Sequence, residues 1–124
     1  MADLFTNAGI ANTVTALTTQ GTDKYLTWGT GTGATASSAG PVTPAAPTTT
    51  TAVTGTQSAV TTTVTGDTLQ VVGTITASGT VAITEVGLGT SATAATAMTQ
   101  YHSFAAINLV SGDSIAFTIK RKYS

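Results

Sequence analysis

The residues that could support catalysis or metal binding are few and lie far apart in this sequence. The chain has one histidine, His102, which lies in the segment TQYHSFA, and it has no cysteine. A metal site or an acid–base pair needs several such groups in a convergent arrangement, and no His-rich spacing is present. We therefore interpret His102 as a structural residue and predict no catalytic, cofactor-binding or metal-binding residues and no cofactor.

The carboxylates and the glycine-rich run lead to the same expectation. The acidic residues are Asp3, Asp23, Asp67, Glu85 and Asp113. Three of these five look like turn or terminus residues, where a carboxylate accepts from nearby backbone N–H groups. No nucleophile elbow accompanies the serines. The run GTGTG at 29–33 lacks the Lys-Ser or Lys-Thr that a phosphate loop requires. We expect that the protein is not an enzyme.

Strands have to position these residues, because the composition is that of a β protein. The chain of 124 residues contains 31 Thr and 20 Ala, and its Leu, Ile, Val and Phe residues total 25. Branching at Cβ suits Thr and Val to a pleated sheet. A chain of this length can form a single domain with a modest core.

The charge content is unusually low. Charged residues make up 7% of the chain and the net charge is −1. In isolated soluble domains roughly a quarter of the residues are charged. Such a surface suits a protein that is covered by partners. The basic run at 120–122 is too short to indicate nucleic-acid binding. No apolar run has membrane-spanning length and no secretory signal precedes residue 23, so we expect synthesis in the cytoplasm and no membrane partner.

The apolar pattern predicts an all-β fold without a helix. On the last strand Ile115, Phe117 and Ile119 face inward, and on an earlier one Leu69 and Val71 do. We predict a two-sheet antiparallel β-sandwich, jelly-roll-like or a barrel-like variant of it. The turn signal Ser-Gly at 78–79 predicts a hairpin between its flanking strands. The expected strands are 23–29, 59–66, 67–78, 80–88, a short one within 99–110, and 114–122.

Two regions do not fit that pattern. Residues 30–58 hold all three prolines and few large apolar side chains, so they predict a long, irregular Thr/Ala/Pro/Gly-rich excursion from the domain at 23–124. Residues 1–22 predict an N-terminal arm, either a disordered start, an edge strand, or a segment that docks on a neighbour. Leu4, Phe5 and Ile10 are its candidate contacts with a partner.

The segment ITEVGLG at 83–89 breaks the strand pattern. Ile83 and Glu85 point to one face of an extended chain, and Val86 and Leu88 point to the other. A β-bulge at Glu85 or Gly87 would explain the switch. A second buried surface would also explain it, which makes Val86 and Leu88 candidate subunit-contact residues.

Two segments resemble a known family. DKYLTWGTGTG resembles a pattern near the start of small tailed-phage virion proteins of the capsid decoration (cement) or tail-fibre-like type. The run from TTTVTGDTLQ to TEVGLG, followed by YHSFAAINLVSGDSIAFTIK, resembles their C-terminal β-domain. The match covers about half of the chain. Gly89 stands where the family pattern often has an aromatic residue.

The resemblance implies a structural virion protein without enzymatic activity. We expect a capsid decoration protein on the outside of the phage head, with the major capsid protein and other copies of itself as partners, assembled as a homotrimer. Leu4, Phe5 and Ile10 are then the capsid-contact candidates. The alternative is a tail-fibre or receptor-binding module, which favours exposed aromatic and polar clusters on loops; the long loops here carry almost none.

Overall fold

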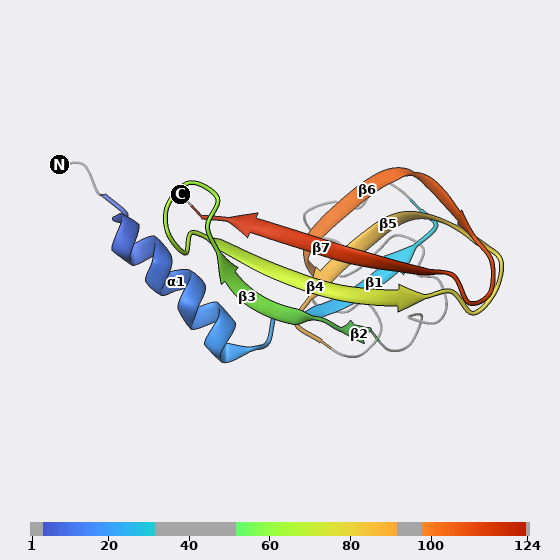
Figure 1. The fold of residues 1–124 in the computed structure, drawn as a ribbon, viewed down its shortest axis with the longest axis horizontal. Coiled ribbons are helices and arrows are strands. Elements are labelled where there is room, and N and C mark those ends of the chain that lie inside the picture. Colours follow the sequence, from blue (N-terminus) through green and yellow to red (C-terminus); the bar gives the residue numbers. More distant parts are fainter. Residues whose placement is uncertain (1–3, 32–51, 92–97, 124) are drawn as a thin grey trace.

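The chain folds as an antiparallel β-sandwich of two sheets with one short helix. The computed structural model describes residues 4–31, 52–91 and 98–123. One sheet has the strand order β2-β1-β5-β6 and the other has the order β3-β4-β7 (Figure 1). The strands are β1 (Tyr25–Gly29), β2 (Val53–Thr54), β3 (Thr56–Val60), β4 (Thr68–Thr76), β5 (Val81–Gly89), β6 (Met98–Leu109) and β7 (Ser114–Lys122). The predicted all-β, two-sheet architecture is confirmed.

A helix, α1 (Asn7–Gln20), occupies most of the predicted arm, so the expectation of a fold without helices was wrong. Thr6 caps its start, since the Thr6 hydroxyl accepts from the N–H of Gly9 at 3.1 Å. Gly21 ends the helix in the left-handed region, with φ of 68°, and its N–H donates to the carbonyl of Leu17. These two caps are the local signals for the helix.

Packing against the sandwich fixes the helix in place. Ile10 and Val14 lie one helical turn apart and are both buried. The helix contacts β3 and β4 and lies at one end of the molecule (Figure 1). Residues 7–20 are therefore part of the folded body, whereas Leu4 and Phe5 before the cap are exposed.

The core lies between the two sheets. Trp28 is fully buried and meets the ring of Phe117 edge to face, with 6.4 Å between ring centroids. Gly73 on β4 lets the sheets approach, because a Cβ there would overlap the Leu26 side chain. The buried apolar cluster comprises Val14, Leu26, Trp28, Leu69, Val71, Ile75, Ala77, Ile83, Val86, Leu88, Leu109 and Ile119.

The predicted hairpin around Ser78-Gly79 was also wrong. β4 and β5 lie in different sheets, so the chain crosses between the sheets at 77–80. β4 instead pairs with β7 along its whole length, from Thr68 opposite Lys122 to Thr76 opposite Ser114. The expected strand at 59–66 was misplaced, because β3 ends at Val60 and a turn follows it.

The end of the predicted excursion is ordered. β2 and most of β3 fall within 52–58, and residues 32–51 lie outside the described residues. No helix in the described part of the chain is long and apolar enough to cross a membrane.

Candidate interaction site

The candidate contact residues of the N-terminal segment separate into two groups. Leu4 and Phe5 precede the helix cap and are 84% and 55% exposed. Ile10 is 4% exposed, because it faces the sandwich from the first turns of α1. Ile10 therefore cannot contact a partner as expected, whereas Leu4 and Phe5 have the exposure that a contact requires.

The switch of faces in β5 comes from an irregular register. Ile83 pairs with Ile107 and Glu85 pairs with Ser103. These pairs are two residues apart on β5 but four residues apart on β6, so β6 has two extra residues in this interval. The irregularity at Glu85 was predicted, although the extra residues belong to β6.

As a result, Val86 and Leu88 enter the same buried cluster as Ile83, despite their spacing. They are 2% and 1% exposed. Both are therefore core residues and do not form an apolar pair on an outer face, although Val86 also lines an open groove between β6 and β7. Their predicted place at or near a subunit contact stays a prediction.

Glu85 is fully buried, and its carboxylate accepts hydrogen bonds from other parts of the chain. Its carboxylate accepts from the N–H of Gly31 at 3.0 Å and from the hydroxyl of Tyr101 at 2.8 Å. The neighbouring Thr84 hydroxyl donates to the carbonyl of Gly31 at 2.6 Å. These bonds hold the segment after β1 against β5.

Asp67 organises the turn between β3 and β4. Its carboxylate accepts from the N–H groups of Thr62, Thr63 and Val64 and from the hydroxyl of Thr68, at 2.8 to 2.9 Å. Burial raises the pKa of this carboxyl, but the donors from Val64, Thr62, Thr63 and Thr68 outweigh it and hold the pKa well below its usual range.

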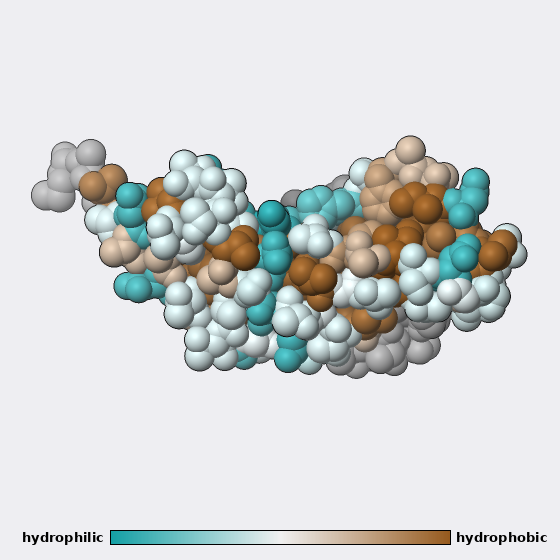
Figure 2. Space-filling model, in the orientation of Figure 1, coloured by the Kyte–Doolittle hydropathy of each residue, from teal (hydrophilic) through white to brown (hydrophobic). Residues whose placement is uncertain are grey.

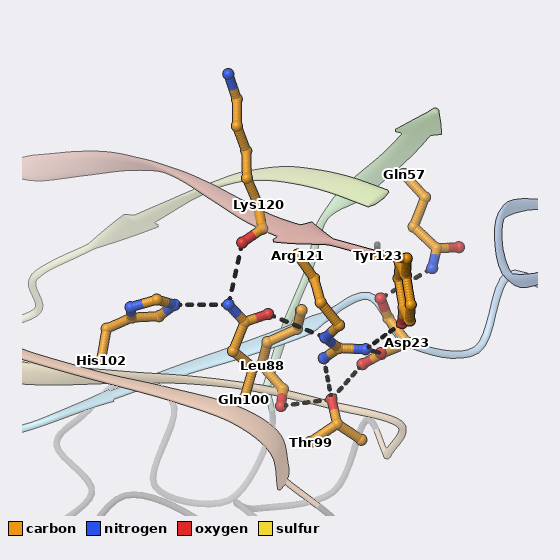
Figure 3. Close-up of polar contacts among 9 residues, drawn as sticks. All are labelled: Asp23, Gln57, Leu88, Thr99, Gln100, His102, Lys120, Arg121 and Tyr123. Atoms are coloured by element: carbon orange, nitrogen blue, oxygen red, sulfur yellow. Dashed lines mark hydrogen bonds and ion pairs between the residues drawn. The ribbon is translucent and has the colours of Figure 1, made fainter. Parts of the chain in front are cut away.

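A polar network joins the two sheets at one end of β6 and β7 (Figure 3). An Arg121 Nη1 lies 2.6 Å from a carboxylate oxygen of Asp23. The same guanidinium donates to the Thr99 hydroxyl at 3.0 Å and to the Gln100 side-chain carbonyl at 3.2 Å. Burial lowers the pKa of Arg121, but its contacts with Tyr123 and Asp23 raise it above its ordinary value. Arg121 is therefore a permanent cation inside a cross-link.

The histidine lies at the edge of this network. Gln100 Nε2 is 2.9 Å from His102 Nε2 and donates to the carbonyl of Lys120 at 3.2 Å. Within residues 4–31, 52–91 and 98–123, no group of three His, Cys, Asp or Glu side chains could hold a metal ion. His102 thus contacts a neighbour on its own strand, and it is Gln100 that joins β6 to β7.

Next to the network, residues of β6 and β7, which are edge strands of the two sheets, line an apolar groove. We call it the β6–β7 groove. Its volume is about 240 Å³. Figure 2 shows apolar side chains gathered over this part of the molecule. The lining residues are Val86, His102, Phe104, Ile107, Phe117, Thr118, Ile119 and Lys120.

Apolar side chains that pack against the core remain partly exposed in this groove. The rings of Phe104 and Phe117 lie 6.3 Å apart, one on each sheet, and both are only half-buried. Ile107 is exposed as well. The sequence did not indicate this groove. The alternation in SIAFTIKRK placed Phe117 inward, but nothing marked the groove that it lines.

Comparisons with known proteins assign no family. No protein-family model matches the chain, and neither a curated protein nor a solved structure matches it.

Proposed function

We propose that this protein is a capsid decoration protein, a non-enzymatic component of a phage virion that binds the outside of the assembled head. The observation that carries the proposal is the exposed apolar surface. Leu4 and Phe5 extend ahead of α1, and the β6–β7 groove is open elsewhere on the molecule. Apolar surfaces of this kind are typical of proteins that function in contact with other subunits.

The distribution of charge supports the same proposal. Of the described carboxylates, Asp23, Asp67 and Glu85 are buried and Asp113 is exposed. The surface therefore carries few acidic groups. Many copies can lie close together on a shell when mutual repulsion is low.

The segments that resemble phage virion proteins correspond to the framework of the sandwich. DKYLTWG includes β1, and the longer segments include β4 to β7. The resemblance therefore concerns the strands that form the core, which is why we extend its implication to the whole domain.

The mechanism is linkage between binding and assembly. A protein that binds the assembled shell, and not its free subunits, stabilises the shell by about 2.7 kcal/mol per site at a hundredfold excess over Kd. The partners are the major capsid protein and other copies of the chain, as a homotrimer. Nucleic acid, a membrane and a cofactor have no part in this function.

The test is co-sedimentation with undecorated heads of the phage that encodes the chain. We expect saturable binding to assembled heads and a higher melting temperature of the decorated heads. Unassembled capsid subunits serve as the control and should not bind. Absence of binding to heads, together with binding to purified tails or to host-cell glycans, would replace this function with the receptor-binding alternative.

A further inference from the structure

The β6–β7 groove has the form of an acceptor for an apolar segment. Both of its walls are edge strands, since β6 and β7 each end their sheet. Edge strands of stable monomers are usually protected by charged residues or proline. β6 has neither in its twelve residues. The groove therefore combines an apolar floor with an edge strand that carries no Lys, Arg, Asp, Glu or Pro.

The chain also carries an apolar segment that its own fold leaves largely exposed. Leu4 and Phe5 precede α1 and are exposed, and residues of β6 and β7 line the groove. The N-terminus and α1 lie at one end of the molecule (Figure 1). Because α1 packs on β3 and β4, it holds this segment far from the groove of the same chain.

We propose that Leu4 and Phe5 of one copy insert into the β6–β7 groove of a neighbouring copy. An apolar cavity of about 150 Å³ holds benzene, so a groove of about 240 Å³ has room for the Phe5 ring. Charge is complementary too, because Asp3 precedes Leu4 in the sequence and Lys120 lies in the groove lining.

This inference goes beyond the proposed function, because the contact forms between copies of the chain and requires no capsid. The donor and acceptor surfaces differ, so the contact closes either as a two-fold exchange, in which each copy both donates and accepts, or as a heterologous ring of more copies. The expected homotrimer is the ring form, with three equivalent insertions.

Disulfide trapping tests the contact directly, since the chain has no native cysteine. Leu4→Cys, which leaves the Phe5 ring in place, and Ile107→Cys proteins are mixed at micromolar concentration and oxidised. We expect a covalent dimer between the two variants. Val72→Cys replaces Ile107→Cys in the control. Val72 lies on β4 outside the groove lining, and its exposed fraction of 38% is close to the 41% of Ile107. Equal yields in the two mixtures would overturn the inference.

Sedimentation of single variants gives a second readout. Phe5→Ser should shift the oligomer to monomer, and its melting temperature should equal that of the unmodified chain at dilutions where both are monomeric. Val110→Ser is the matched control, because Val110 is 56% exposed, close to the 55% of Phe5, and is not part of the groove lining. It should leave the oligomer intact.

Two results would contradict the insertion. The unmodified chain could sediment as a monomer at every concentration tested. Alternatively, Phe5→Ser could keep its oligomeric state and lose binding to heads; the segment would then be a capsid anchor, and the proposed function would stand without this inference.

Discussion

Arg121 on β7 and Asp23, just before β1, are 98 positions apart in the chain, yet a guanidinium nitrogen of one lies 2.6 Å from a carboxylate oxygen of the other. The pair joins the two sheets at the end of β6 and β7 where the polar network lies (Figure 3). Asp23 is almost fully buried and Arg121 is partly exposed.

Removing the cation should destabilise the sandwich, because Asp23 would remain as a buried charge. For Arg121→Met we expect a loss of about 2–3 kcal/mol, between the values for exposed and buried pairs. Arg121→Lys keeps the charge and should lose less. Urea unfolding measures both. In the double variant Asp23→Asn/Arg121→Met, additive losses would show that the pair is not coupled.

Asp67 should make the fold acid-sensitive. Its folded-state pKa lies below the unfolded value of about 3.9. Its stabilising contribution is therefore complete above that pH and is lost as the pH falls toward the folded-state pKa. Urea unfolding across about pH 2.5 to 7 should give a weaker pH dependence for Asp67→Asn than for the unmodified chain. Parallel curves would exclude Asp67 as the source of the acid sensitivity.

The two groups of N-terminal residues should respond differently to truncation. Ile10→Ala removes a buried side chain and should cost about 2–5 kcal/mol. Leu4→Ala removes a side chain that is exposed in the single chain, and at dilutions where the copies are monomeric it should change stability by less than about 0.5 kcal/mol. Thermal unfolding of the free protein measures both. Similar losses would mean that the segment before Thr6 belongs to the core.

Gly73 should be intolerant of a side chain. Gly73→Ala places a methyl group against Leu26, and such overpacking costs about 1–3 kcal/mol. Gly79→Ala is the control, since a Cβ at Gly79 meets no atom within 4 Å. A Gly73→Ala protein as stable as the control would show that the sheets can move apart without cost.

Several strands could be predicted because their side chains alternate between the core and solvent. Leu69, Val71 and Ile75 on β4 are all buried, as expected. The helix was missed because its many Thr residues are weak helix formers. Burial of Ile10 and Val14 and the caps at both ends outweigh that local preference.

Pairing and the groove depend on relations that no local pattern contains. The Ser78-Gly79 signal marks a change of direction but not the sheet that the next strand joins. Likewise, Phe104 and Ile107 line the same groove with an odd spacing, because the register between β5 and β6 is irregular there. A strict alternation would place these two side chains on opposite faces.

The crossing between β4 and β5 has a consequence for the order in which the protein folds. β4 pairs with β7 and β1 pairs with β5, and in both pairs the second strand comes much later in the chain. Neither sheet can therefore be completed from segments that are neighbours in the sequence. Closing such long loops before their contacts form makes folding slow. During synthesis, one hydrogen-bonding edge of β4 therefore remains unpaired until β7 has left the ribosome. This interval is when the nascent chain is most exposed to aggregation and most dependent on chaperones.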